Sequence, residues 1–91
     1  MIQALYVDDD PSFLEIGKMF LEHSGIIRIT TALSAMNALE AMQNQQFDVI
    51  ISDYEMPGMN GLQYLKKVRE TDAIIPFIIF TGRGREDVAI E

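Results

Sequence analysis

Three aspartates stand at or near the ends of apolar segments that have the composition of buried strands. Asp8 and Asp9 follow residues 2–7, and Asp53 follows the run at residues 49–51. Thr81 stands in the same way after residues 77–80. The carboxyl ends of parallel strands lie along one edge of a sheet, where ligands bind in such folds. We therefore expect these side chains on one rim, with three carboxylates in one pocket if the first and third strands are neighbours.

A pocket of three carboxylates favours metal and phosphoryl chemistry. Like charges this close raise one another's pKa values, and a divalent cation removes that cost. Mg²⁺ takes oxygen ligands, usually one or two carboxylates together with waters and phosphate oxygens. A carboxylate beside Mg²⁺ can also attack phosphorus and form an aspartyl phosphate. The Thr81 hydroxyl could then donate a hydrogen bond to a phosphoryl oxygen.

The first half of the chain predicts two strands and two helices. Asp10 and Pro11 are typical of a helix N-cap and first helical position, and Gly25 is typical of a helix end. A second strand is expected over residues 26–31, and Ser34 is expected to cap a second helix. The helical spacing indicates that the following residues form the apolar faces of these helices: Phe13, Ile16, Gly17 and Phe20, then Ala35, Ala38, Leu39 and Met42.

The second half continues the alternation. Residues 49–51 form a continuous apolar strand, which suggests burial on both faces, and residues 56–61 form a loop by composition. Leu62, Leu65 and Val68 mark the face of a third helix, and Tyr54 and Tyr64 are expected to be partly exposed. Residues 77–80 predict a fourth strand, and a fourth helix is expected from Arg85 onward. The order βαβαβαβα indicates an α/β fold with a doubly wound parallel sheet.

Composition limits the function further. A chain of 91 residues with 48% apolar residues forms one domain, and the absence of cysteine excludes disulfides and thiolate metal sites. No apolar run approaches the ~18 residues of a membrane span, and no signal peptide is visible, so a cytoplasmic location is expected. Residues 1–60 hold 9 acidic and 2 basic residues, whereas residues 61–91 hold 5 of each. The resulting net charge of −7 should repel nucleic acid.

Three motifs resemble those of response-regulator receiver domains in two-component signal transduction. They are the segments Val-Asp-Asp-Asp-Pro at 7–11, Asp-Val-Ile-Ile-Ser-Asp-Tyr-Glu-Met-Pro-Gly-Met-Asn-Gly at 48–61 and Phe-Ile-Ile-Phe-Thr-Gly at 77–82. The similarity spans nearly the whole chain, and the middle motif is highly specific. The resemblance implies a flavodoxin-like receiver fold with strand order 2-1-3-4, in which residues 1–91 form one receiver domain.

The resemblance also implies roles for individual residues. Asp53 would accept a phosphoryl group from the phosphohistidine of a histidine kinase. Asp9 would bind Mg²⁺ directly, Asp8 mostly through a water, and the backbone carbonyl of Glu55 would complete the protein ligands. Thr81 would be the switch hydroxyl that turns toward the phosphate. The downstream partner would be an effector protein or an attached output domain, and Glu55 and Arg83 would occupy positions that tune the lifetime of the phosphate.

One departure from the family concerns the C-terminal part. The family has a fifth strand that ends in Lys-Pro and a fifth helix, and this chain ends before both. Lys66 and Lys67 lie in the predicted third helix, where they cannot replace the phosphate-binding lysine. We expect a C-terminally incomplete receiver from a longer parent. The alternative is a shortened protein that dimerises through an uncovered sheet edge.

Simpler interpretations remain open for several residues. Asp10 is most simply an N-cap, and Asp8 and Asp9 could be acids that favour a helix N-terminus. His23, the single histidine, is expected on the surface near a helix end. For the whole chain, a signalling switch rather than a turnover enzyme is the leading hypothesis. The alternatives are a phosphorylation-independent docking module and a Mg²⁺-dependent phosphohydrolase in which Glu55 would act as acid and base.

Overall fold

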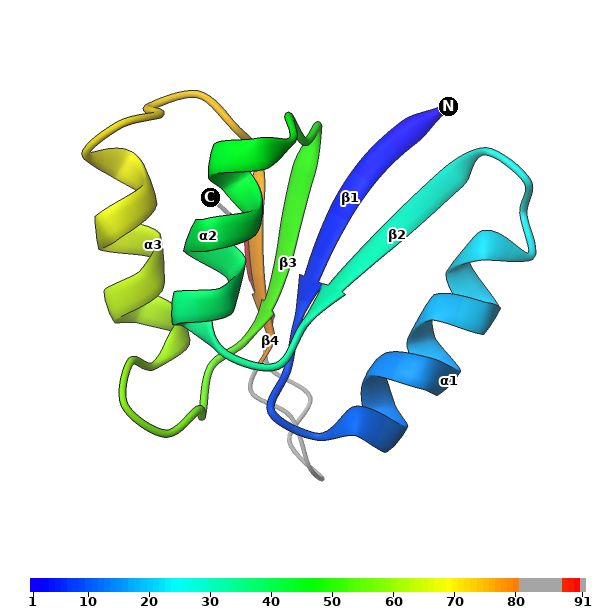
Figure 1. Ribbon diagram of the computed structural model, residues 1–91, viewed down its shortest axis with the longest axis horizontal. Helices are drawn as coiled ribbons and strands as arrows, with labels where there is room; N and C mark the ends of the chain where they lie inside the picture. Colours follow the sequence, from blue (N-terminus) through cyan, green and yellow to red (C-terminus); the bar gives the residue numbers. More distant parts are fainter. Residues whose placement is uncertain (81–87, 91) are drawn as a thin grey trace.

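Four parallel strands form the centre of the fold, and β1 lies between β2 and β3 (Figure 1). The computed structural model describes residues 1–80 and the backbone of residues 88–90. Its elements are β1 (Ile2–Val7), α1 (Pro11–Glu22), β2 (Ile27–Ala32), α2 (Ala35–Asn44), β3 (Val49–Asp53), α3 (Gly61–Arg69), β4 (Phe77–Phe80) and β5 (Val88–Ile90). The expected order 2-1-3-4 of the parallel strands is confirmed.

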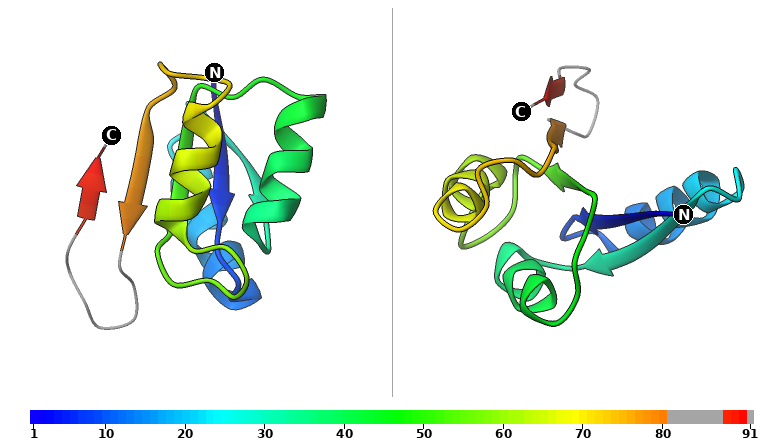
Figure 2. Two further views of the ribbon diagram at one scale, coloured as in Figure 1. Left: turned by 90° about the vertical axis from the view of Figure 1, so that its left-hand side faces the viewer. Right: turned by 90° about the horizontal axis from the view of Figure 1, so that it is seen from above.

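Helices cover both faces of this sheet, as expected for a doubly wound fold. Helix α1 lies on one face, and α2 and α3 lie on the other (Figure 2). The side chains of β1 alternate between the two layers: Leu5 and Val7 belong to the buried cluster beneath α2 and α3, whereas Ala4 and Tyr6 belong to the cluster beneath α1. Strand β1 is therefore buried on both sides, which explains its uninterrupted apolar sequence.

The helix starts follow the capping residues read from the sequence. The Asp10 carboxylate accepts hydrogen bonds from the backbone N–H groups of Ser12 and Phe13, and Pro11 occupies the first turn. The Ser34 hydroxyl accepts from Asn37 N at 3.1 Å. These caps satisfy amide groups that have no partner within their own helix, and they fix where each helix leaves the carboxyl end of its strand.

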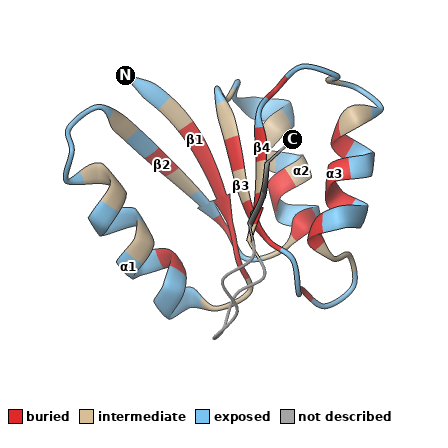
Figure 3. Ribbon diagram, turned by 180° about the vertical axis from the view of Figure 1, so that it is seen from behind, coloured by how far each residue is buried: buried red, intermediate tan, exposed pale blue. Residues whose placement is uncertain are grey.

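The predicted apolar face of α1 is wrong for most of its members. Leu14 is the buried residue of this helix, whereas Phe13, Ile16 and Phe20 are exposed, Phe20 to 79%. A Cβ on Gly17 would lie 2.5 Å from Cε2 of Tyr6, so the helix rests on the tyrosine ring at Gly17. This contact turns Leu14 toward the sheet. Phe13, Ile16 and Phe20 then form an apolar stripe that faces outward. Most of α1 is accordingly coloured as exposed or intermediate in Figure 3.

The expected fourth helix is also wrong where the structure describes it. Residues 88–90 form β5, which pairs antiparallel with β4 through Ile78–Ile90, Ile79–Ala89 and Phe80–Val88. Residues 85–87 lie outside the described residues. The free edge of β4 offers backbone N–H and C=O groups that a strand can satisfy and a helix cannot. Residues 88–90 thus add a fifth strand to the sheet, although the chain was expected to end before one.

Candidate phosphoacceptor and metal site

The carboxylates of Asp8, Asp9 and Asp53 meet at the carboxyl edge of the sheet. One oxygen from each lies within 4.8 Å of the others. The register pairs Val7 of β1 with Ser52 of β3, which brings the residues that follow them side by side. Asp8 and Asp53 are each 1% exposed, and Asp9 is half-buried. The structure thus brings together the three acids that the strand ends predicted.

The separation of these oxygens suits a small divalent cation. In octahedral coordination at about 2.0–2.1 Å, two Mg²⁺ ligands lie about 2.9 Å apart when adjacent and about 4.2 Å apart when opposite. Oxygens within 4.8 Å of one another would need only side-chain rotations or a bridging water to reach these spacings. Two buried carboxylates in one pocket repel each other strongly, so positive charge at this point would stabilise the fold. The oxygen-only donor set fits Mg²⁺ rather than a soft metal.

Asp10 lies beside this cluster, but its carboxylate has another function. Its Oδ1 accepts from Ser12 N at 2.9 Å and from Phe13 N at 3.4 Å. Its backbone N–H donates to Oδ1 of Asp8 at 2.9 Å. The side chain therefore caps α1, as the simpler interpretation held, while its backbone helps to orient Asp8.

Two aromatic rings that the sequence analysis did not assign to the site lie beside these acids. Phe80 is the register partner of Asp53 on β4, and its ring centroid lies 6.1 Å from that of Tyr6. Burial raises the pKa of the Tyr6 phenol, and the charges of Asp8 and Asp53 raise it further. Strand alternation was the available signal, because Tyr6 and Asp8 are two residues apart and so share one side of β1.

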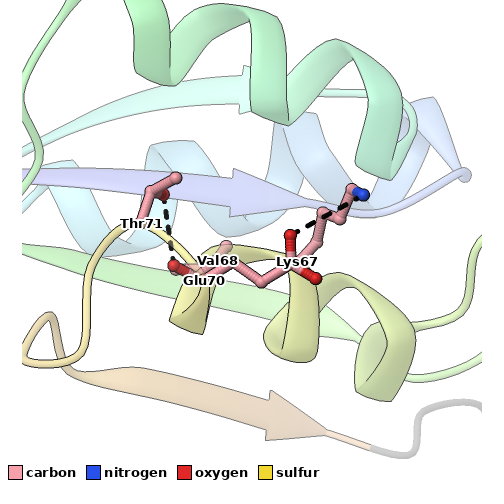
Figure 4. Close-up of polar contacts among 4 residues, drawn as sticks. All are labelled: Lys67, Val68, Glu70 and Thr71. Carbon is pink, nitrogen blue, oxygen red and sulfur yellow. Dashed lines mark hydrogen bonds and ion pairs between the residues drawn. The ribbon is translucent and has the colours of Figure 1, made fainter.

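The other predicted site residues are placed as follows. Glu55 has an exposed side chain in the loop after β3, and Thr81 and Arg83 lie outside the described residues. Lys66 and Lys67 lie in α3, as expected, and Lys67 Nζ is 3.8 Å from Glu70 Oε1 (Figure 4). His23 is exposed at the end of α1. Within the described residues, no helix is long and apolar enough to cross a membrane.

Comparison with known sequences identifies the family. The family described as "Response regulator receiver domain" matches residues 4–91, so the chain belongs to the response-regulator receiver family. Response regulator Rre1 of Synechocystis is 36% identical over 85 residues, which cover 91% of this chain and 37% of that protein. The transcriptional regulator NtrC of Escherichia coli is 36% identical over 84 residues, 92% of this chain and 18% of that protein. The chain thus spans well under half the length of these relatives.

Solved structures agree in fold. The chemotaxis response regulator CheY4 of Vibrio cholerae has a TM-score of 0.82 and 34% identity over 87% of this chain and 67% of that one. TrrA of Thermotoga maritima, crystallised with Mg²⁺ and BeF, has a TM-score of 0.75 and 34% identity over 80% of this chain and 63% of that one. TrrA in the complex with the histidine kinase ThkA has a TM-score of 0.83 and 32% identity over 96% of this chain and 76% of that one. The chain is therefore a regulatory receiver domain by family and by fold.

Proposed function

We propose that Asp53 accepts a phosphoryl group from a histidine kinase and that the chain acts as a phosphorylation-controlled signalling switch. One observation carries this proposal: in a receiver-family chain, the Asp8, Asp9 and Asp53 carboxylates converge within 4.8 Å at the carboxyl edge of the sheet. Asp53 ends β3, a strand held between β1 and β4, so its backbone is fixed while its carboxylate faces the other two acids.

In this reaction an Asp53 carboxylate oxygen attacks phosphorus. An O–P bond forms, the P–N bond to the kinase histidine breaks, and the electron pair leaves with the imidazole nitrogen. Mg²⁺, when bound, would supply the positive charge that offsets the carboxylates and phosphoryl oxygens. Asp9 would hold it directly and Asp8 mostly through a water, with the Glu55 carbonyl and Asp53 as further ligands. Thr81 would donate its hydroxyl to the phosphoryl group.

Two solved structures of a similar protein support the cofactor and the partner in this proposal. TrrA was crystallised with Mg²⁺ and BeF, and in a second structure it is in complex with the histidine kinase ThkA. For this chain we infer a histidine kinase as the phosphodonor. Because its curated relatives are longer proteins, several of them transcriptional regulators, the signal would pass to an attached output domain or to a separate effector protein.

The test is phosphorylation by acetyl phosphate, followed by intact mass. With Mg²⁺ we expect one phosphoryl adduct, and without Mg²⁺ or in Asp53→Asn we expect none, because the acceptor oxygen or its counter-charge is missing. Circular dichroism of both proteins controls for folding. A folded wild-type chain that takes no adduct in Mg²⁺ would contradict the phosphoacceptor role. It would favour a docking module, as would partner binding that Asp53→Asn leaves unchanged.

A further inference from the structure

The backbone that follows the proposed acceptor is held from two sides. The N–H of Tyr54 donates to the carbonyl of Phe80 on β4 at 2.8 Å, and the carbonyl of Tyr54 accepts from the N–H of Gly61 at 2.8 Å. Gly61 is the first residue of α3. The chain therefore leaves β3, passes through the loop of residues 54–60, and returns so that the start of α3 rests on the end of β3.

This return requires a residue without a side chain. A Cβ on Gly61 would lie 2.5 Å from the carbonyl oxygen of Asp53 and 3.0 Å from Cα of Tyr54. Real Cβ atoms essentially never approach closer than 3.0 Å, and the atoms met here are backbone atoms that cannot rotate away. Among the described glycines, positive φ angles occur at Gly25 and Gly58 and not at Gly61. Close approach, rather than an unusual backbone conformation, is thus the reason for a glycine here.

Neither partner in this contact can yield easily. The start of α3 is fixed by a capping box in which Asn60 Oδ1 accepts from Gln63 N at 2.8 Å and Gln63 Oε1 accepts from Asn60 N at 2.9 Å. The same helix buries Tyr64, Leu65 and Val68 in the larger core. On the other side, the strand that ends in Asp53 is hydrogen-bonded between two neighbours. A methyl group at Gly61 must therefore displace the Asp53 peptide or lift the first turn of α3 by about 0.5 Å or more.

We infer that Gly61 is a positioning residue for Asp53: its missing side chain lets α3 lock the peptide of the acceptor in the place where its carboxylate faces Asp8 and Asp9. This inference rests on the proposed function. Catalytic groups have to be held within about 0.5 Å of their productive geometry, and a misplacement of about 1 Å can cost about 10²-fold in rate. A single methyl group at this position should accordingly slow phosphoryl transfer by about 10- to 100-fold.

The experiment compares Gly61→Ala with Gly25→Ala. The control adds the same methyl group after α1, at a glycine with a φ of 80°, where an alanine is strained but its Cβ would meet no atom within 4 Å. For both variants and the wild type we would measure the acetyl phosphate reaction rate at saturating Mg²⁺, the Mg²⁺ dissociation constant from amide chemical shifts, and urea unfolding. We expect the slower rate and a dissociation constant raised at least about threefold in Gly61→Ala. In Gly25→Ala both should stay within about twofold of wild type, whatever its stability.

The outcomes separate this inference from the proposed function. If the wild type takes no phosphoryl group, the proposed function fails. If the wild type reacts and a folded Gly61→Ala reacts at the same rate, or if Gly25→Ala loses as much, positioning by Gly61 is refuted. Should Gly61→Ala not fold, Asn60→Ala loosens the same turn without adding an atom there. A several-fold lower rate in that folded variant would support the inference, and an unchanged rate would overturn it.

Discussion

At the scale of single residues, Tyr64 shows how far a polar group can be buried in this fold. The sequence suggested partial exposure, but the side chain is 0% exposed. Its hydroxyl donates to Met42 Sδ at 3.3 Å, and its ring meets that of Phe77 edge-on at 5.2 Å. Burial raises the pKa of this phenol well above its ordinary value, because a phenolate there would lose its hydration and gain only a weak sulfur partner.

This raised pKa predicts a loss of stability in alkali. The folded chain holds the Tyr64 proton more tightly than the unfolded chain, in which tyrosine ionises near pH 10. The free energy of unfolding therefore keeps its full value below about pH 10 and falls as the pH rises further. In Tyr64→Phe this decline should be shallower, and the Tyr6 phenol, whose pKa is also raised, should account for part of what remains.

Urea unfolding of wild type and Tyr64→Phe between about pH 8 and pH 11 measures this effect. Tyr54→Phe is the matched control for the substitution itself, because it removes the same hydroxyl from a ring that is 36% exposed. Parallel curves for all three proteins would show that the Tyr64 phenol does not control alkaline stability.

At the scale of elements, the start of α1 separates two functions of neighbouring carboxylates. Asp10 is occupied by the N–H groups of the first turn, whereas Asp8 and Asp9 face Asp53. A side chain that accepts hydrogen bonds as an N-cap can be an amide as well as a carboxylate. A direct ligand of Mg²⁺, in contrast, contributes negative charge that an amide does not replace.

We therefore predict different effects on Mg²⁺ binding for Asp10→Asn and Asp9→Asn, each of which exchanges a carboxylate for an amide of the same shape. Asp10→Ala should lower the free energy of unfolding by about 1 kcal/mol, while Asp10→Asn should change it by no more than a few tenths of a kcal/mol. Asp10→Asn should leave the Mg²⁺ dissociation constant within about threefold, whereas Asp9→Asn should raise it by tenfold or more. Urea unfolding and calorimetric Mg²⁺ titration provide the two measurements. A large loss of Mg²⁺ affinity in Asp10→Asn would mean that Asp10 is itself a metal ligand.

At the scale of the whole molecule, local signals predicted the frame and missed what depends on distant contacts. Apolar runs that end in acids located β1 and β3, and the caps at Asp10 and Ser34 located two helices. The face of α1 could not be predicted, because it depends on the Tyr6 ring reaching Gly17 across two elements. The strand β5 was missed because hydrogen bonding to the edge of β4, rather than local propensity, decides its conformation.

The candidate site could also be predicted only in part from local signals. The three acids were predicted, because strand ends share an edge whatever the packing. The place of Phe80 beside Asp53 comes from the register of β3 with β4, and the close approach of Gly61 depends on where α3 returns to the sheet. Neither follows from spacing along the chain, although Gly61 stands in the motif that carried the family resemblance.

The two layers of the molecule are unequal, and this inequality predicts unequal costs for equal substitutions. Among the described residues, the cluster beneath α2 and α3 contains 13 buried residues and the cluster beneath α1 contains 4. Leu65 of α3 and Leu14 of α1 are both 5% exposed. A cavity lowers stability most where its surroundings cannot relax into it. Helix α1 packs on the smaller cluster and turns its apolar stripe outward, so it can move into a cavity more easily than α3.

Leu65→Ala should therefore cost about 4 kcal/mol and Leu14→Ala about 2 kcal/mol, the upper and lower parts of the range for such substitutions. Ile16→Ala is the control on α1, because Ile16 is 65% exposed and its loss should change stability by no more than about 0.5 kcal/mol. Urea unfolding gives all three values, provided that the slope of each transition is unchanged. Equal costs for the two leucines would mean that the α1 layer is as tightly packed as the layer beneath α2 and α3. A large cost for Ile16→Ala would mean that the outward stripe is covered in solution.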